Sequence, residues 1–123
     1  MSHRNWFRTR RSKESAGGSY DDVSFGPVEP GRHYTIQRYA VEDENSALTG
    51  DIRVFVAGHG YNHYLVEKDT PAAAELVWEN EPTHLFEGET LTARFTGATS
   101  GDDLHLYLEG WWEEVGEGGD WSG

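Results

Sequence analysis

The sequence predicts an all-β protein built as a single antiparallel β-sandwich, and three observations lead to this prediction. Short runs of residues alternate between apolar and polar side chains, which is the pattern of strands buried on one face. Turn-forming residues separate these runs at intervals of roughly ten residues, and no stretch has the periodicity of a long helix. About seven or eight short strands with regular turns are typical of a sandwich or a small barrel, and we favour a jelly-roll-like sandwich.

The clearest alternation lies in residues 85–112, LFEGETLTARFTGATSGDDLHLYLEGWW. Apolar side chains share one face of each half of this stretch. They are Leu91, Ala93 and Phe95 in the first half, and Leu104, Leu106, Leu108 and Trp112 in the second, where His105, Tyr107, Glu109 and Trp111 lie opposite. Residues 97–103 between the halves are small or polar, as a turn requires. We therefore expect two strands paired as a hairpin.

Further strands are expected on the N-terminal side of this stretch. Residues 34–41 alternate and predict a core strand with Tyr34, Ile36, Arg38 and Ala40 on one face. Residues 51–57 and 61–67 have β character on either side of Gly58-His59-Gly60, which predicts a second hairpin. Residues 72–75 suit a single helical turn, residues 76–78 a short strand, and residues 83–86 lead into the stretch described above.

The composition divides the chain into three parts. Residues 1–27 are basic and then rich in serine and glycine, so they are expected to form an extended arm because they can bury little apolar surface. Residues 28–112 carry the strand patterns and are expected to form the sandwich domain. Residues 113–123 are acidic and rich in glycine, and we expect a mobile tail with one large apolar side chain, Trp121.

The charge is large and unevenly distributed. The chain has 22 acidic and 10 basic residues, a formal net charge of −12. Five of the basic residues lie in the first 13 positions, so the remaining 110 residues hold 5 basic and 22 acidic groups, a net charge of −17. Lysine occurs only at positions 13 and 68. Such an acidic, lysine-poor surface is typical of proteins from salt-loving organisms, with an ordinary acidic mesophilic protein as the alternative.

Several classes of protein do not fit the sequence. A length of 123 residues allows one domain, and the absence of cysteine excludes disulfides and thiolate metal sites. No apolar run approaches the roughly 18 residues of a membrane span, and no apolar stretch follows the basic N-terminus as it would in a secretory signal. We therefore expect synthesis in a cytoplasm and no contact with membranes.

Neither an enzyme nor a resident cofactor is expected. The chain has no G-x-S-x-G elbow, no phosphate-binding glycine loop and no cysteine nucleophile. His59 and His63 lie four residues apart, and His84 or His105 could approach them, but the pair spans a predicted turn and lacks identifiable orienting partners. We therefore expect no transition-metal site. The many acidic pairs single out no catalytic pair, and whether the loops bind calcium stays open.

Two groups of residues are candidates for binding a partner. The first combines two aromatic rings with an arginine cluster in the expected arm, where guanidinium groups can bind carboxylates or phosphates. It comprises Trp6, Phe7, Arg8, Arg10 and Arg11, to which we add Trp121 of the tail. The alternative is a solvated tail without a role. Direct contact with nucleic acid is not expected, because the acidic body would repel it.

The second group is a possible platform of aromatic side chains for stacking on a sugar ring. It comprises Tyr61, Tyr64, Tyr107 and Trp111. The alternative reading places these side chains in the sandwich core or in a subunit interface, as is usual for aromatic residues in a small domain.

Two stretches carry a resemblance to a family of proteins. GETLTARFTGATSGDDLHLYLEGWWEE, together with GYNHYLVEKDTPAAAELVW before it, resembles the C-terminal half of small β-sandwich virion proteins of tailed viruses of bacteria and archaea. The likeness covers roughly residues 30–114 and contains no catalytic motif. Together with the acidic composition, it implies a virion protein of a haloarchaeal tailed virus.

The resemblance implies a non-enzymatic role in particle assembly. The protein would decorate the head, form a turret or spike base, or act at the neck, with its termini contacting neighbouring capsid, portal or spike subunits. It would be made in the host cytoplasm, reside in the virion and form homo-oligomers there. Deleting residues 1–20 is then expected to leave the sandwich folded and to abolish incorporation into particles. A glycan-binding module on a viral spike or fibre is the alternative function.

Overall fold

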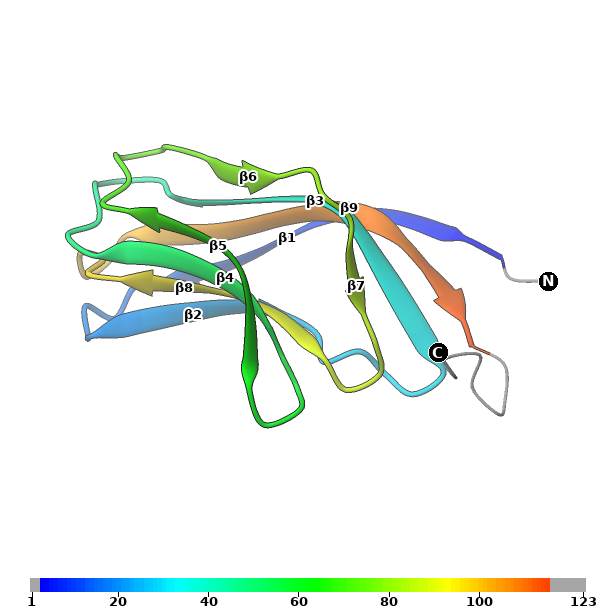
Figure 1. Cartoon of the computed structure of the whole chain (residues 1–123). Coiled ribbons are helices and arrows are strands. Elements are labelled where there is room, and N and C mark those ends of the chain that lie inside the picture. Colours follow the sequence, from blue (N-terminus) through cyan, green and yellow to red (C-terminus); the bar gives the residue numbers. More distant parts are fainter. Residues whose placement is uncertain (1–2, 116–123) are drawn as a thin grey trace.

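The computed structural model describes residues 3–115, and its regular structure there consists entirely of β-strands. The strands form two antiparallel sheets that pack together as in a β-sandwich, which confirms the predicted fold class (Figure 1). They are β1 (Asn5–Glu14), β2 (Tyr20–Phe25), β3 (Arg32–Asp43), β4 (Asp51–Ala57), β5 (Asn62–Asp69), β6 (Val77–Glu79), β7 (Thr83–Leu85), β8 (Thr90–Thr96) and β9 (Asp103–Glu114).

The chain passes repeatedly from one sheet to the other. Sheet A has the strand order β1-β9-β3-β6, and β7 pairs with β3 next to β6; sheet B has the order β2-β8-β4-β5. Within residues 3–115, β4 and β5 are the consecutive strands that pair directly with each other, so this predicted hairpin is confirmed. Most other connections cross between the sheets, and both inner faces therefore contribute to one core.

The alternation predicted for residues 85–112 is confirmed, but the predicted hairpin is wrong. β8 pairs with β2 and β4, whereas β9 pairs with β1 and β3, so the connection crosses between the sheets. The buried rows are Leu91, Ala93 and Phe95 of β8 and Leu104, Leu106 and Leu108 of β9. In a hairpin both rows would lie on the same face of one sheet. In the sandwich they face a common core from opposite sides.

A β-bulge in β3 changes which side chains face the core. The pairing with β9 shifts register between Ile36 and Arg38, so β3 has one extra residue, Gln37. The predicted face is therefore right for Ile36 and wrong beyond the bulge, where Tyr39 and Val41 are buried in the core instead of Arg38. A one-residue insertion inverts the two faces because strand side chains alternate with a period of two.

The interpretation of the N-terminal segment as an arm outside the sandwich is wrong for two stretches of it. β1 pairs with β9 along its ten residues, and β2 pairs with β8, so the segment adds one strand to each sheet. Phe7 explains why β1 joins the sandwich. Its ring packs on the core side, stacked on Phe25 at a centroid distance of 5.6 Å and edge-on to Tyr34 at 5.6 Å. The basic composition concealed this alternation of inward and outward side chains. Of the expected tail, residues 116–123 lie outside the described residues.

Two smaller points complete the fold. Residues 72–75 form a turn rather than a helical turn, with Glu75 N donating to Ala72 O at 3.1 Å and Ala74 at a φ of +57°. A search of residues 3–115 finds no helix that is long and apolar enough to cross a membrane.

Candidate functional site

The outer face of sheet A brings together residues from both predicted binding groups. On β9 the side chains of these residues alternate with the core leucines, so they point away from the core. The cross-strand pairs between β1 and β9 on this face are Trp6 with Trp111, Arg8 with Glu109, and Arg10 with Tyr107. Part of the expected arm (Trp6, Arg8 and Arg10) and part of the expected aromatic platform (Tyr107 and Trp111) thus share one face. The sequence did not indicate this, because the pairing of β1 with β9 joins residues about a hundred positions apart.

Aromatic rings form one end of this face. The Trp6 and Trp111 ring centroids lie 4.9 Å apart, and the Arg4 guanidinium lies 4.3 Å from the Trp111 ring centroid. These neighbours cover Trp111, whose indole Nε1 is buried and has no acceptor among residues 3–115. Trp6 itself is 63% exposed. A partner that docks here would therefore contact Trp6 first.

Ion pairs occupy the centre of the face. Glu109 lies between Arg8 and Arg38, at N–O distances of 3.4 Å and 3.9 Å. The Arg8 side chain is 82% exposed, and exposed ion pairs of this kind contribute about 0–1 kcal/mol to folding. Both guanidinium groups can therefore exchange Glu109 for carboxylates of a partner at little cost in stability.

A hollow of about 440 Å³ opens beside these ion pairs. It is lined by Arg8, Thr9, Arg38, Tyr39, Ala40, Glu42, Leu76, Tyr107, Leu108 and Glu109. Trp78, which pairs with Ala40 and is 54% exposed, lies next to this lining with its ring centroid 6.0 Å from the Arg38 guanidinium. Exposed tryptophan, tyrosine and arginine around a shallow hollow are the composition of protein interface centres.

A serine–histidine–glutamate chain lies at the other end of the face. His105 Nδ1 is 2.7 Å from Ser12 Oγ, and its Nε2 is 2.7 Å from a carboxylate oxygen of Glu44. These are the groups of a hydrolase triad, and the sequence concealed them because Ser12 was assigned to the arm. A hydrolase also needs oxyanion donors and a hollow at the serine, and the 440 Å³ hollow is lined by neither Ser12 nor His105. Ser12 and Glu44 thus satisfy the hydrogen-bonding groups of both ring nitrogens of the buried His105.

The remaining predicted residues lie elsewhere. Phe7 packs against the core, and the Arg11 guanidinium covers the Phe25 ring at 5.1 Å. Tyr64 lies on β5 in sheet B, against Phe55 of β4 at 5.3 Å. Tyr61 lies at the tip of the β4–β5 hairpin. The four aromatic residues therefore do not form one platform, because they belong to both sheets and to a hairpin tip. Trp121 lies outside the described residues.

A second hollow, of about 320 Å³, lies between the β4–β5 hairpin and the segment that contains β7. Its lining consists of Val56, Gly58, His59, Tyr61, His63, Leu65, Pro82, Thr83, His84, Phe86 and Glu89. His59, His63 and His84, which were considered as metal ligands, thus share one lining. The His33 ring lies next to the His84 ring. Burial of His33 and, next, the neighbouring His84 lower the pKa of His33 below its usual range.

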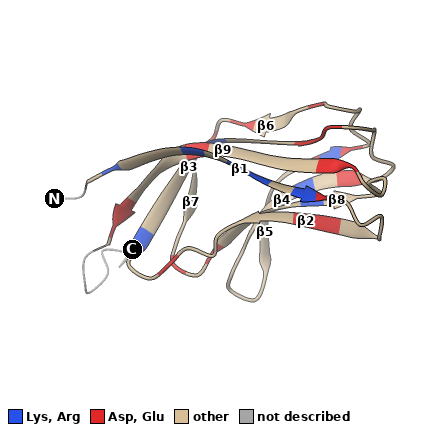
Figure 2. Ribbon diagram, turned by 180° about the vertical axis from the view of Figure 1, so that it is seen from behind, with Lys and Arg blue, Asp and Glu red and all other residues tan. Residues whose placement is uncertain are grey.

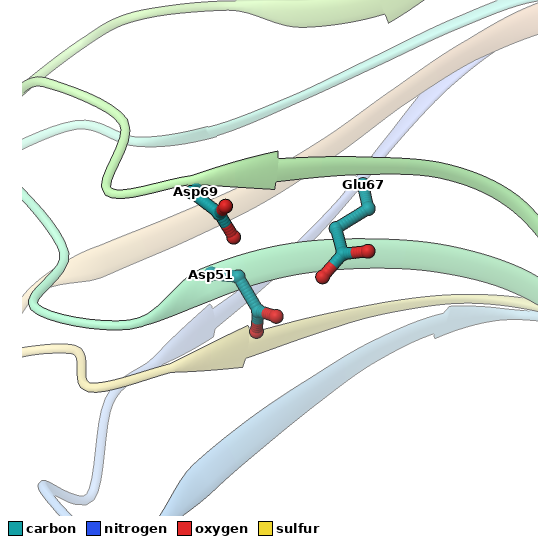
Figure 3. Close-up of side chains that lie close together, drawn as sticks. All are labelled: Asp51, Glu67 and Asp69. Atoms are coloured by element: carbon teal, nitrogen blue, oxygen red, sulfur yellow. The ribbon is translucent and has the colours of Figure 1, made fainter.

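The described residues contain one cluster of three possible metal ligands, and it involves none of these histidines. Asp51, Glu67 and Asp69 offer carboxylate oxygens within 4.8 Å of one another (Figure 3). The Arg53 guanidinium pairs with Asp51 at 3.4 Å and with Glu67 at 3.2 Å. Arg53 therefore already balances part of the negative charge that a cation would balance, and we interpret the cluster as part of an ion-pair network.

Comparison of the chain with known proteins adds no family assignment. No protein-family model matches the sequence, and no curated protein matches it at a significant level. Inferences about function therefore rest on the outer face of sheet A and on the hollow beside β7.

Proposed function

We propose that the protein is a non-enzymatic structural component of a tailed virus particle, and that it binds its neighbours through the outer face of sheet A. The observation that carries the proposal is the row of cross-strand pairs that joins Trp6, Arg8 and Arg10 to β9. Buried tryptophan, tyrosine and arginine contribute most of the binding energy in protein interfaces. Virion localisation, a haloarchaeal host and a place on the head, turret or neck belong to the same proposal.

We also infer that the two sheets form a jelly roll. The strand orders β1-β9-β3-β6 and β2-β8-β4-β5 support this inference, because they correspond to two nested Greek keys in which β6 and β7 together take the place of one strand. Jelly rolls build viral capsid domains as well as lectin domains. The fold thus agrees with particle assembly by analogy, whereas the docking face is the specific argument.

The exposed guanidinium groups favour a partner surface that offers carboxylates. Four of the ten basic residues of the chain contribute to this face or its rim, namely Arg4, Arg8, Arg10 and Arg38, beside the carboxylates of Glu42, Glu44 and Glu109. Figure 2 shows Lys and Arg in blue along β1 and Asp and Glu in red on other strands. At molar salt the Debye length falls to about 3 Å, so long-range attraction would be weak and short bidentate contacts would have to supply the binding energy. We therefore propose the acidic surface of a neighbouring virion subunit as the occupant.

The position of these residues changes the mechanism expected from the sequence. Trp6 and Arg8 belong to a paired strand, so docking needs no ordering of a free arm and loses less conformational entropy. Deleting residues 1–20 would remove β1 from sheet A and would disturb folding and docking together. Point substitutions on the outer face are the cleaner test.

The test compares Trp6→Ala with Tyr64→Ala in particles assembled from the neighbouring structural proteins. Trp6 is 63% exposed on the proposed docking face, and Tyr64 is 52% exposed on the other sheet. We expect Trp6→Ala to reduce incorporation by about tenfold or more, the effect of losing an interface anchor, and Tyr64→Ala to leave it unchanged. Incorporation is measured by quantitative immunoblotting of purified particles, with circular dichroism to verify folding. Normal incorporation of a folded Trp6→Ala variant would contradict the proposal.

A further inference from the structure

The hollow of about 320 Å³ beside β7 has features of a ligand site that is separate from the docking face. Its walls come from both sheets, because the β4–β5 hairpin belongs to sheet B and β7 pairs with β3 of sheet A. Figure 1 shows this hairpin beside β7, at the side of the sandwich away from β1. Its volume is at the lower end of the range for small-molecule sites.

A fixed carboxylate lies in one wall. Glu89 is only 9% exposed, and its carboxylate accepts a hydrogen bond from Phe86 N at 2.8 Å and lies 3.0 Å from His59 Nε2. Gly58 packs closely against it, because a Cβ built at Gly58 would lie 3.1 Å from both Cα and Cγ of Glu89. The backbone of the hairpin thus holds Glu89 in place at the edge of the hollow.

Imidazole and aromatic rings complete the lining. His84 Nδ1 lies 3.2 Å from His33 Nε2 and 3.5 Å from Thr35 Oγ1, which fixes the orientation of the His84 ring. Phe86 packs against His33 at a centroid distance of 5.0 Å. Tyr61, at the hairpin tip, is 66% exposed. The hollow therefore combines groups that both donate and accept hydrogen bonds with flat apolar surfaces.

This combination selects one class of ligand. Glu89 and the net charge of −12 disfavour an anion. Among residues 3–115, no three histidine or carboxylate groups of this hollow converge within 4.8 Å, which disfavours a metal ion. A sugar ring presents hydroxyl groups that donate and accept along its edge and an apolar face that stacks on aromatic rings. We propose that the hollow binds one or two rings of a neutral saccharide, with Glu89 and His84 contacting hydroxyls and Tyr61 stacking on the ring.

The inference does not rest on the proposed assembly role, because the two surfaces share no residue. It revises the glycan-binding alternative in one respect. Of the four aromatic residues predicted as a platform, only Tyr61 lies at this hollow, and the stacking surface is completed by Phe86.

A glycan array tests the proposal first, with purified full-length protein, and methyl glycosides of glucose, galactose, mannose and N-acetylglucosamine then serve as probes in heteronuclear NMR titrations. We expect binding with chemical-shift changes confined to residues 56–65 and 82–89. Tyr61→Ala and Glu89→Gln should each weaken binding by about tenfold or more. The control Trp78→Ala, a substitution next to the docking face at a residue that does not line this hollow, should bind like the wild type.

Each outcome decides the proposal. No binding to the array by the wild-type protein would overturn it, and so would binding that survives Tyr61→Ala. Glu89→Gln retains an acceptor for Phe86 N–H, and thermal unfolding verifies that this variant folds. If it does not fold, Tyr61→Ala still decides, because this largely exposed side chain contributes little to the core.

Discussion

At the scale of single residues, Asp43 is an acidic group whose surroundings disfavour its ionised form. Its Oδ1 accepts hydrogen bonds from Asn45 N at 3.0 Å and Ser46 N at 3.2 Å, while Oδ2 is buried and the Asp102 carboxyl group lies nearby. Burial, and next the neighbouring Asp102 carboxyl group, raise the pKa of Asp43 from 3.8 to about 6. The folded protein therefore binds a proton at Asp43 more tightly than the unfolded chain does.

Asp43→Asn is expected to remove a pH-dependent loss of stability. Because the folded pKa lies above the unfolded value, the contribution of Asp43 is most favourable below about pH 4 and is lost as pH rises through about 6. The asparagine keeps an oxygen acceptor without the charge. We expect the variant to be more stable than the wild type by on the order of 1–3 kcal/mol near pH 7, and by little near pH 4. Urea unfolding across this range measures the difference, and an equal effect at both pH values would contradict the argument.

A second residue-scale feature is the close approach of β3 and β9 at the bulge. Gly110 pairs with Ile36, and a Cβ built at Gly110 would lie 2.0 Å from Thr35 O. No side chain fits at that distance without moving the backbone of one strand. Glycine is therefore required at this position by the neighbouring strand rather than by its own φ angle.

Gly110→Ala is expected to destabilise the protein by about 2 kcal/mol or more, because β9 must move away from β3. The sign is informative, since alanine in place of glycine normally stabilises a compatible position by about 0.4–1 kcal/mol. Gly18→Ala is the matched control, because a Cβ there would meet no atom within 4 Å. Chemical denaturation of both variants measures the two changes. Equal stability of both variants would refute the close approach.

At the scale of elements, β1 explains how a strongly basic segment belongs to an acidic sandwich. It forms the edge of sheet A, and basic side chains on an edge strand oppose pairing with a second copy of the same strand. Phe7 anchors it on the core side, and Trp6 and Arg8 remain on the outer side for a partner. One strand thus combines protection of the edge with the proposed docking surface.

Strand pairing could be predicted from the sequence only where the two paired strands are neighbours along the chain. The β4–β5 hairpin is joined by a short turn, so its pairing could be predicted from residues 51–67 alone. The partner strands of β8 and β9 could not be predicted in this way. Alternation of apolar and polar side chains shows that one face of a strand is buried, but it does not show which strands pair with it. The bulge at Gln37 has no signal in a period-two pattern, and it reversed the expected faces of Tyr39 and Arg38.

The same limit applies to the candidate sites. Trp6 and Trp111 were each singled out from local composition, but their contact at 4.9 Å depends on the register of β1 on β9. The hollow beside β7 depends on the packing of the hairpin against a strand of the other sheet. Residue types could therefore be predicted from the sequence, whereas their grouping into sites required the sheet topology.

At the scale of the whole molecule, the excess of acidic groups opposes folding through self-repulsion. The net charge is −12, and most of the ion pairs described above lie at the surface, where each contributes about 0–1 kcal/mol. Asp51, Glu67 and Asp69 concentrate three carboxylates around a single arginine, Arg53. Screening by salt should therefore weaken the repulsion between acidic groups more than the attraction within the ion pairs. We expect salt to stabilise the fold.

Raising sodium chloride from about 0.1 M to about 1 M shortens the Debye length from about 10 Å to about 3 Å, so we expect the thermal unfolding midpoint to rise by several degrees. Asp69→Asn serves as the matched variant, because it removes one charge of the cluster and should show a smaller rise. The urea midpoint, measured at both salt concentrations, is an independent readout. A fall of the midpoint with salt would mean that surface ion pairs outweigh the self-repulsion, and would remove the physical basis for the expected adaptation to high salt.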